Sequence, residues 1–394
     1  MAETFSRDAL PAPGEPSWAR ALREEALTSF EQLPIPSQNT EEWRYTDLSD
    51  FDFEAFRPHP QAAELVAPDL PEGVVFTSLD EAIERHPDLI EKALHDLVPH
   101  DRTKFTALHA AFRTGGVFVH VPRNARVEVP IRATTLLERA GAAVFPHTLI
   151  VAEEGADLTF VDRYVSPDLE AFSDAVTEIV VGPGARVRYV SLQDWGSGVQ
   201  HLAVQRASVD RDATLHSLSV AFGASLSRTE VESVLAAPGA SSEMLGVYFT
   251  DDDQHFDHRS LQDHAAPNGT SDLLYKGALR DESSAVYSGL IRVRPGAQKT
   301  DAMQTNRNVV LSERAKADSI PNLEIEANDV RCGHAASVGP VSDEEIFYLQ
   351  SRGIPREEAE RLIVKGFFQE VIDRIPLPDV RDAIEEAIDE ELRR

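Results

Sequence analysis

The sequence predicts a mainly β fold, namely a right-handed parallel β-helix (a solenoid) flanked by helical regions at both ends. Two patterns in the middle of the chain lead to this prediction. Small turn pairs recur at spacings of 27 to 31 residues, and most are followed by residues that alternate between apolar and polar, as half-buried strands do. The pairs are Asn124-Ala125, Gly155-Ala156, Gly184-Ala185, Asp212-Ala213, Gly239-Ala240, Asn268-Gly269 and Gly296-Ala297. A fixed period of this length is typical of stacked repeats, in which each coil buries its inner face against its neighbours.

Other repeat architectures fit this period less well. Propeller blades need roughly 40 to 50 residues per repeat. Helix-pair repeats do not fit, because the segments alternate with period two and are rich in Val and Thr. The usual handedness of parallel crossovers predicts a right-handed coil. We therefore predict a mainly helical N-terminal region over residues 1–100, the parallel β-helix over residues 101–335, and a C-terminal helical region over residues 336–394.

Both terminal regions show helical periodicity. Apolar residues recur at helical spacing in residues 16–33 and again in residues 79–98. Near the other end, Ser342 and Glu345 have the spacing of a capping box, and Gly353 suits the end of that helix. The next stretch carries an apolar stripe that includes Leu362, Ile363, Phe367 and Val371. Such helices either protect the ends of a solenoid or dock a partner.

The composition excludes several classes of function. The 67 acidic residues outnumber the 38 lysines and arginines, and the formal net charge of −29 is unsuited to DNA or RNA, which need a basic surface. No uninterrupted apolar stretch is long enough for a membrane span, and residues 1–5 lack the features of a secretory signal. The single cysteine, Cys332, excludes an internal disulfide and fits a reducing compartment. We therefore expect a cytoplasmic protein.

The acidic excess also raises a hypothesis about the host. A surface rich in acids and poor in lysine suits a salt-rich cytoplasm, where screening relieves the repulsion between like charges. The alternative to this halophilic hypothesis is an ordinary acidic bacterial protein.

Signatures of nucleotide binding and catalysis are absent from the sequence. Lys299-Thr300 is preceded by Gln298 and not by glycine, so we predict that this chain binds no nucleotide. Gly182 and Gly184 lie in a predicted solenoid turn, with no third glycine opening a helix. The chain also lacks a Gly-x-Ser-x-Gly elbow and a His-Glu-x-x-His zinc helix. We therefore predict that the protein is not an enzyme.

Two groups of histidines are candidate metal ligands. The first group lies among aspartates and contains His255, His258 and His264 with Asp251, Asp252, Asp253, Asp257 and Asp263. Because its spacing matches no defined metal site, we interpret this stretch as a solvated polar face of the solenoid.

The second group is Cys332-Gly333-His334. On a strand, alternation places the thiol of Cys332 and the imidazole of His334 on the same face. Both groups are good ligands for iron and zinc. Two ligands cannot complete a four-coordinate site, so the others would have to come from elsewhere, for example from another chain. The alternative is that Cys332 is simply a small buried apolar residue.

Several stretches outside the turn pairs resemble the SufB/SufD family of iron–sulfur cluster assembly proteins, and in particular its SufD-type members. Glu41-Glu42-Trp43-Arg44-Tyr45-Thr46-Asp47-Leu48 is similar to an early motif of the family, and residues 104–108 and 116–122 are similar to the start of its β-helix. The densest similarity lies in residues 297–368. It includes Gln298-Lys299-Thr300-Asp301, Asn306-Arg307, Leu323-Glu324-Ile325, Asp329-Val330, Cys332-x-His334, Phe347-Tyr348-Leu349 and Ser351-Arg352-Gly353-Ile354.

This resemblance implies a right-handed parallel β-helix between helical end regions, in agreement with the repeat pattern. It also implies that the chain is a scaffold subunit that pairs with SufB and binds the ATPase SufC through its C-terminal helices. His334, with Cys332 as a helper, then becomes a candidate ligand of a nascent iron–sulfur cluster that is held transiently and shared with SufB. The stripe of Leu362, Ile363, Phe367 and Val371 becomes the candidate SufC contact. When isolated, the chain is expected to form a homodimer.

Two alternatives remain open. A SufB-like paralogue is usually longer and carries a cluster cysteine late in its β-helix, whereas here Cys332 lies in the SufD-type Cys-x-His element, with Gly333 where serine is more usual. A β-helix polysaccharide hydrolase or lyase would use carboxylates such as Asp251 and Asp253. The missing secretory signal and the similarity over residues 297–368 argue against the second alternative.

Overall fold

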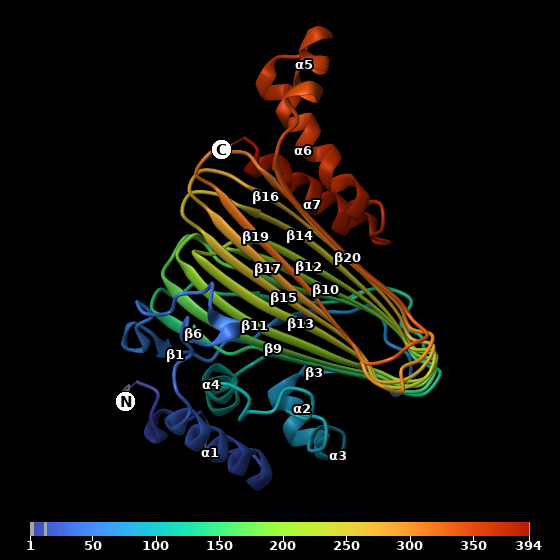
Figure 1. The fold of residues 1–394 in the computed structure, drawn as a ribbon. Helices are drawn as coiled ribbons and strands as arrows, with labels where there is room; N and C mark the ends of the chain where they lie inside the picture. The colour runs from blue at the N-terminus through green and yellow to red at the C-terminus, as the bar shows by residue number, and fades with distance from the viewer. Residues whose placement is uncertain (1–3, 12–13, 394) are drawn as a thin grey trace.

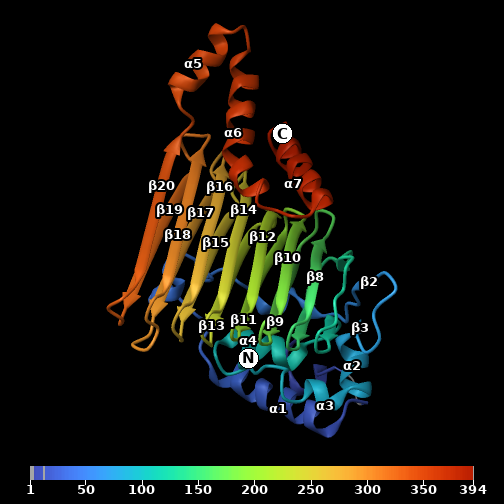
Figure 2. The same ribbon diagram turned by 90° about the vertical axis from the view of Figure 1, so that its right-hand side faces the viewer.

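The middle of the chain forms a parallel β-solenoid in the computed structural model, which describes residues 4–11 and 14–393 (Figure 1). The described strands form one sheet of eleven strands and one of nine, and the chain alternates between the two as it winds. Helices lie at both ends of the chain (Figures 1 and 2). The predicted mainly β solenoid with helical ends is therefore confirmed. Residues 1–3, part of the segment in which we found no secretory signal, lie outside the described residues.

The two sheets stack coil upon coil. In spatial order, the first contains β19 (Lys316–Ile325), β17 (Ser284–Val293), β15 (His255–His264), β13 (Leu226–Leu235), β11 (Val199–Val209), β9 (Ala171–Val181), β7 (His147–Ala152), β4 (Val117–Val121) and β3 (Val75–Ser78), with β1 (Arg57–Pro58) and β6 (Ala142–Val144) at its side. The second contains β2 (Glu64–Val66), β5 (Ile131–Leu136), β8 (Asp157–Val165), β10 (Arg186–Trp195), β12 (Thr214–Gly223), β14 (Ser241–Thr250), β16 (Thr270–Leu279), β18 (Asp301–Val310) and β20 (Arg331–Pro340). Among the described strands, only the pairs β2–β5 and β3–β4 are antiparallel.

The turn pairs mark one corner of successive coils. Six of the seven first positions, all except Gly296, have φ between +54° and +77°, the left-handed region that glycine, asparagine and aspartate tolerate best. The second positions are mostly buried alanines, as at Ala213 and Ala240, because only a small side chain fits where the corners stack. The strands therefore pair in register from coil to coil, and Thr214 lies between Arg186 and Ser241.

The N-terminal region combines helices with the short strands β1 to β3. Its helical elements are η1 (Arg7–Ala9), α1 (Ser17–Gln32), η2 (Glu41–Trp43), η3 (Phe53–Ala55), α2 (Leu79–Arg85), α3 (Pro87–Ile90) and α4 (Lys104–Phe112). The helix predicted over residues 16–33 forms as α1. The helical stretch predicted over residues 79–98 is interrupted, because proline starts a new helix more readily than it continues one, and Pro87 opens α3. A cluster of buried aromatic rings joins α1 and α4 to the first sheet.

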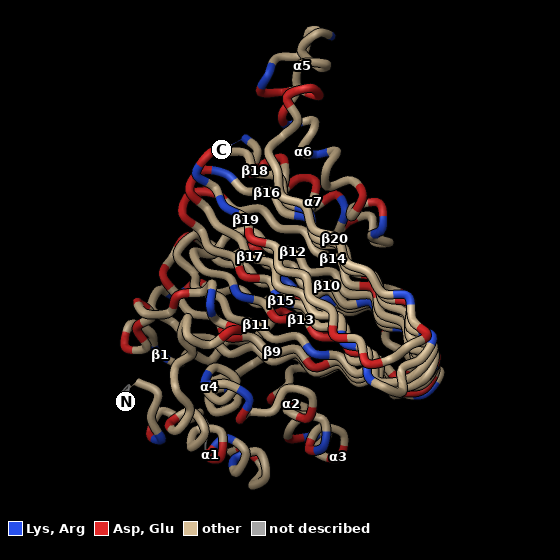
Figure 3. Tube along the Cα trace, in the orientation of Figure 1, with Lys and Arg blue, Asp and Glu red and all other residues tan. Residues whose placement is uncertain are grey.

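The C-terminal region contains α5 (Asp343–Ser351), α6 (Arg356–Ile372) and α7 (Pro378–Glu391). Ser342 caps α5 by accepting a hydrogen bond from the backbone N–H of Glu345 at 3.3 Å, and Gly353 follows that helix at φ +88°. Helix α6 packs on the outer face of the second sheet, while α5 projects beyond it (Figure 2). Among the described residues, no helix is both long and apolar enough to cross a membrane. Acidic residues recur in the terminal helices and at the turns of the solenoid (Figure 3).

Candidate functional site

Cys332 and His334 lie on β20, the last strand of the second sheet. They pair with Ala302 and Gln304 of β18. Burial alternates along β18 and its buried residues include Ala302 and Gln304, so Cys332 and His334 both lie over the inner face of the solenoid. The sequence prediction that these two side chains share one face is therefore confirmed.

Cys332 is half-buried and packs against a small apolar cluster that includes Ile291 and Ala302. Burial raises the pKa of the Cys332 thiol, the nearby charge of Asp301 raises it further, and a backbone hydrogen bond from Ala302 opposes both effects. The thiol is therefore protonated at neutral pH in this arrangement. To act as a metal ligand it would have to lose its proton to the incoming metal.

His334 is exposed and lies beside a polar part of the solenoid interior. Its neighbour Gln304 is fully buried, yet neither polar atom of its side chain has a hydrogen-bond partner. Further along β18, Asn308 donates a hydrogen bond to Asn306 at 2.8 Å, and Tyr248 donates one to Asn308. These polar residues of β18 place hydrogen-bonding groups in the part of the interior next to the imidazole.

The last coil leaves this end of the solenoid open. Strands β19 and β20 end their sheets, and no described strand pairs with their outer edges. Each edge is ten residues long. Two apolar side chains of this coil, Ile325 and Val338, are 42% and 45% exposed although their strand positions face inward. An edge of this length and apolar content is a ready surface for pairing with another chain.

The C-terminal helices are anchored on the solenoid through one face of α6. Val364, Phe368 and Ile372 are buried against the second sheet. The ammonium group of Lys276 donates to the backbone oxygen of Phe367 at 2.7 Å and lies 4.8 Å from the centre of its ring. These contacts hold α6 in a defined orientation on the second sheet.

The predicted partner stripe on α6 divides into two parts. Leu362 is 43% exposed, and Ile363 and Phe367 are partly exposed. Val371 is fully buried against the second sheet, so it holds α6 in place and does not offer a contact to a partner. Its inclusion in the exposed stripe is a correction that the structure requires. Helical spacing alone did not show which side of α6 faces the sheet.

The largest exposed apolar side chains of this region lie on α5. Phe347 is 73% exposed and Tyr348 is 57% exposed. Because α5 projects away from the solenoid (Figure 1), both rings are presented to solvent with little support from neighbouring elements. The resemblance in sequence assigns the C-terminal helices as a whole to SufC but does not single out these two residues. Exposed aromatic side chains of this kind are typical of protein interfaces.

The acidic stretch around His258 is not a solvated face, and that interpretation is wrong. Asp257, His258, Asp263 and His264 are all 2% exposed or less. The N-terminal segment covers part of this strand, and Thr46 donates a hydrogen bond to Asp257 at 2.6 Å. Strand alternation could not reveal this cover, because the covering segment lies some 200 residues away in the sequence.

The carboxylates suggested for a polysaccharide-cleaving site do not act together. Asp251 is buried with its carboxylate 3.4 Å from Arg280, whereas Asp253 is exposed. A pair of catalytic carboxylates would have to face one substrate. This arrangement gives no support to the hydrolase alternative.

A two-sheet parallel solenoid with an open last coil, a Cys-x-His element on its edge strand and projecting C-terminal helices is the architecture expected of an assembly scaffold. Residues 135–367 match the family described as "SUF system FeS cluster assembly, SufBD core domain", and residues 54–133 match the "SufBD protein N-terminal region". The chain therefore belongs to the SufBD family of iron–sulfur cluster assembly proteins.

Similar proteins occur in several bacteria. The iron-sulfur cluster assembly protein SufD of Bacillus subtilis is 32% identical over 96% of this chain and 95% of its own length. A SufBD family protein of Mycobacterium leprae is 38% identical over 75% of this chain and 76% of its own length. A SufBD family protein of Staphylococcus aureus is 30% identical over 92% of this chain and 77% of its own length.

Proposed function

We propose that this chain is the SufD-type scaffold subunit of a SUF complex, and that it pairs with SufB and binds the ATPase SufC. The observation that carries the proposal is the open last coil, where His334 and Cys332 lie on an edge strand whose outer edge pairs with no described strand. Family membership supports a role in iron–sulfur cluster assembly. The similarity to a SufD protein over nearly the whole chain favours the SufD type.

The open coil is the surface that we assign to SufB. Pairing there would satisfy the free backbone groups of β19 and β20 and would cover Ile325 and Val338. The same edge can pair with a second copy when SufB is absent, which is why we expect a homodimer of the isolated chain. Pro321 within β19 is compatible with an edge position, because proline cannot donate a hydrogen bond to a further strand.

The nascent iron–sulfur cluster is the cargo of this assembly and not a resident group of this chain. His334 would supply one ligand, because a neutral imidazole coordinates iron readily. Cys332 would help only after losing its proton. The remaining ligands would come from SufB, so that the cargo is shared across the interface and can be released when the chains shift. In this proposal the chain is not an enzyme and binds no nucleotide, since SufC supplies the ATP hydrolysis.

The projecting C-terminal helices are the surface that we assign to SufC. On α6, Leu362 is exposed and Ile363 and Phe367 are partly exposed, and Phe347 and Tyr348 add exposed apolar surface on α5. Helix α5 begins shortly after β20 ends, so the surface assigned to SufC adjoins one end of the open coil (Figure 2).

Co-expression of this chain with SufB and SufC tests the proposal. We expect the three proteins to co-purify, and we expect the chain alone to elute as a homodimer that SufB converts into a heterodimer. Size-exclusion chromatography with mass determination distinguishes these species. A chain that stays unchanged in mass when SufB and SufC are present would contradict the assignment.

A further inference from the structure

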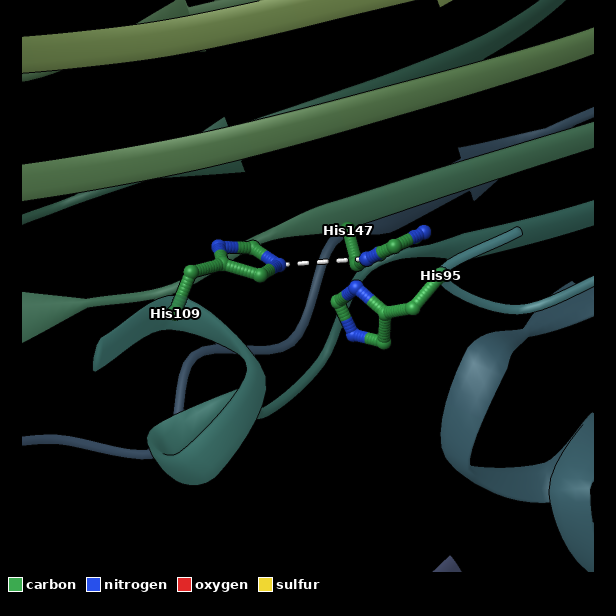
Figure 4. A group of neighbouring side chains, drawn as sticks. All are labelled: His95, His109 and His147. Atoms are coloured by element: carbon green, nitrogen blue, oxygen red, sulfur yellow. Dashed lines mark hydrogen bonds between the residues drawn. The ribbon is translucent and has the colours of Figure 1, made fainter. Parts of the chain in front are cut away.

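Three histidines from separate parts of the chain meet beneath the N-terminal helices. His95 follows α3, His109 lies on α4, and His147 opens β7 (Figure 4). Each offers a ligand nitrogen within 4.8 Å of the other two. His109 and His147 are fully buried and His95 is 7% exposed. None of them belongs to the open coil or to the C-terminal helices, so the proposed function leaves this cluster unexplained.

The outer nitrogens of these rings face groups that only accept hydrogen bonds. Nδ1 of His109 lies 2.8 Å from the backbone oxygen of Asp174, and Nδ1 of His95 lies 3.2 Å from that of Val98. Nε2 of His147 lies 3.0 Å from a carboxylate oxygen of Glu178. A nitrogen lone pair in any of these positions would be repelled by the oxygen, so we assign the protons to these three nitrogens. The contact of His147 with Glu178 is an electrostatic one, without hydrogen-bond geometry.

The inner nitrogens are then left as lone pairs. Nε2 of His109 and Nδ1 of His147 lie 3.1 Å apart, with no proton left to share between them. Nε2 of His95 is buried and has no hydrogen-bond partner. Two facing lone pairs at this distance repel each other unless a proton or a metal cation lies between them.

The spacing of the inner nitrogens suits a metal ion. Two imidazole nitrogens bound to a tetrahedral zinc ion lie about 3.3 Å apart, given bonds of about 2.0–2.1 Å. The observed 3.1 Å is close to this separation. Hydrogen bonds from the outer nitrogens to backbone oxygens, which His95 and His109 make, are also a usual support for metal-bound histidines.

The charges around the cluster can balance a divalent ion. Glu178 is fully buried, and one carboxylate oxygen of the buried Asp174 has no hydrogen-bond partner. The opposing charge is Arg113, which is also fully buried and whose guanidinium lies 3.7 Å from Glu15 and 3.9 Å from Asp80. Glu15 and Asp80 partly neutralise the arginine. Glu178 already accepts hydrogen bonds from the backbone N–H groups of His95, Leu97 and Val98, so it would balance the charge of the metal from the segment that carries His95.

We propose that His95, His109 and His147 bind a divalent first-row transition metal, with zinc the best match to three imidazole ligands. The role of the metal is structural. Its ligands come from the segment after α3, from α4 and from β7, so the ion would fasten the N-terminal helices to the first coils of the solenoid. This site is separate from the cluster cargo at the open coil, and its existence does not depend on the proposed function.

Metal analysis of the purified full-length chain tests this proposal. Because the site is buried, the metal has to be present while the chain folds, so the protein is expressed with added zinc or refolded with zinc or with a chelator. We expect about one zinc ion per chain and a higher midpoint of thermal unfolding when zinc is present. Cobalt(II) in place of zinc should give the visible absorption of a four-coordinate site.

Two variants and a control make the test specific. His109→Gln and His95→Asn should each lower zinc affinity by at least about tenfold and remove the effect of zinc on thermal unfolding. His201→Gln is the matched control, because His201 is also buried but lies outside the cluster. If His109→Gln fails to fold, His95→Asn and the cobalt spectrum still decide the question. If the purified chain contained iron in place of zinc, the site would be supported and iron would be its metal. Equal metal content in wild type and both variants would overturn the site.

Discussion

Arg228 and Asp257 form an ion pair between the neighbouring strands β13 and β15, and the two side chains are only 2% and 0% exposed. The ring of Trp43 lies 3.9 Å from the guanidinium carbon of Arg228, and Thr46 donates a hydrogen bond to the carboxylate of Asp257 at 2.6 Å. Trp43 and Thr46 both belong to the family-like motif of residues 41–48. That motif therefore seals a buried charge pair on the outer face of the solenoid.

Removal of one partner of this pair should be costly. Asp257→Ala leaves the buried Arg228 with Glu230 as its remaining counter-charge and removes the carboxylate beside Arg259, and we expect a loss of about 3 kcal/mol in the free energy of unfolding. Asp194→Ala is the control, because the ion pair of Asp194 with Arg163 is at least half exposed on both sides and should contribute less than about 1 kcal/mol. Denaturant unfolding measures both. Similar losses for the two variants would contradict this account.

Asp162 should make stability depend on pH. Burial raises its pKa from 3.8 to about 6, against the opposing effect of hydrogen bonds from Thr148, Tyr164 and Tyr189. Because the folded pKa is raised, the stabilisation is complete below the unfolded pKa and is lost as the pH rises through about 6. Asp162→Asn removes this titration. The stability of wild type relative to the variant should therefore fall by about 3 kcal/mol between pH 4 and pH 7. If the free energy of unfolding of the two proteins changed with pH in the same way, this role of Asp162 would be excluded.

His334 should matter for cluster assembly and not for folding. The side chain is exposed, so His334→Ala should leave the unfolding midpoint unchanged. In a strain that lacks its own copy of the gene, the variant should fail to support cluster assembly, whereas Cys332→Ala should have a milder effect. Ser337→Ala, on the other face of β20, is the control. Normal iron content in the complex with His334→Ala would return His334 to an ordinary surface residue.

The aromatic side chains of α5 should be needed for SufC. Because Phe347 and Tyr348 are largely exposed, the double change Phe347→Ser and Tyr348→Ser should leave the folded chain intact. It should nonetheless reduce co-purification of SufC by at least about tenfold, since buried aromatic anchors commonly contribute 2 kcal/mol or more to an interface. Val129→Ser, at another exposed apolar residue, serves as the control. Undiminished SufC binding would mean that α5 only covers the end of the molecule.

The net charge of −29 should make stability sensitive to salt. If the host has a salt-rich cytoplasm, added KCl should raise the midpoint of thermal unfolding, because screening relieves the repulsion between acidic residues. Choline chloride at the same ionic strength separates screening from specific potassium binding. A midpoint that does not rise would favour an ordinary acidic protein.

The solenoid could be predicted because every coil meets the same local requirement. A left-handed residue and then a small buried one recur at most of these corners, as at Asp212 and Ala213, so the pattern is visible in sequence alone. The histidine cluster could not be predicted. His95, His109 and His147 share no period, and only the folding of the N-terminal helices onto the first sheet brings them together. The same contact hides Asp257, which sequence alternation alone does not reveal.

The two ends of the solenoid differ in a way that limits how far chains can associate. At the start, the sheets finish in the short antiparallel strands β2 and β3, of three and four residues, whereas the last coil offers two edges of ten residues. A solenoid with long free edges at both ends could polymerise head to tail into a fibre. Here the contact between two last coils would consume the long edges of both molecules. Association would therefore stop at a dimer. The chain can keep an edge that pairs with another chain without forming filaments.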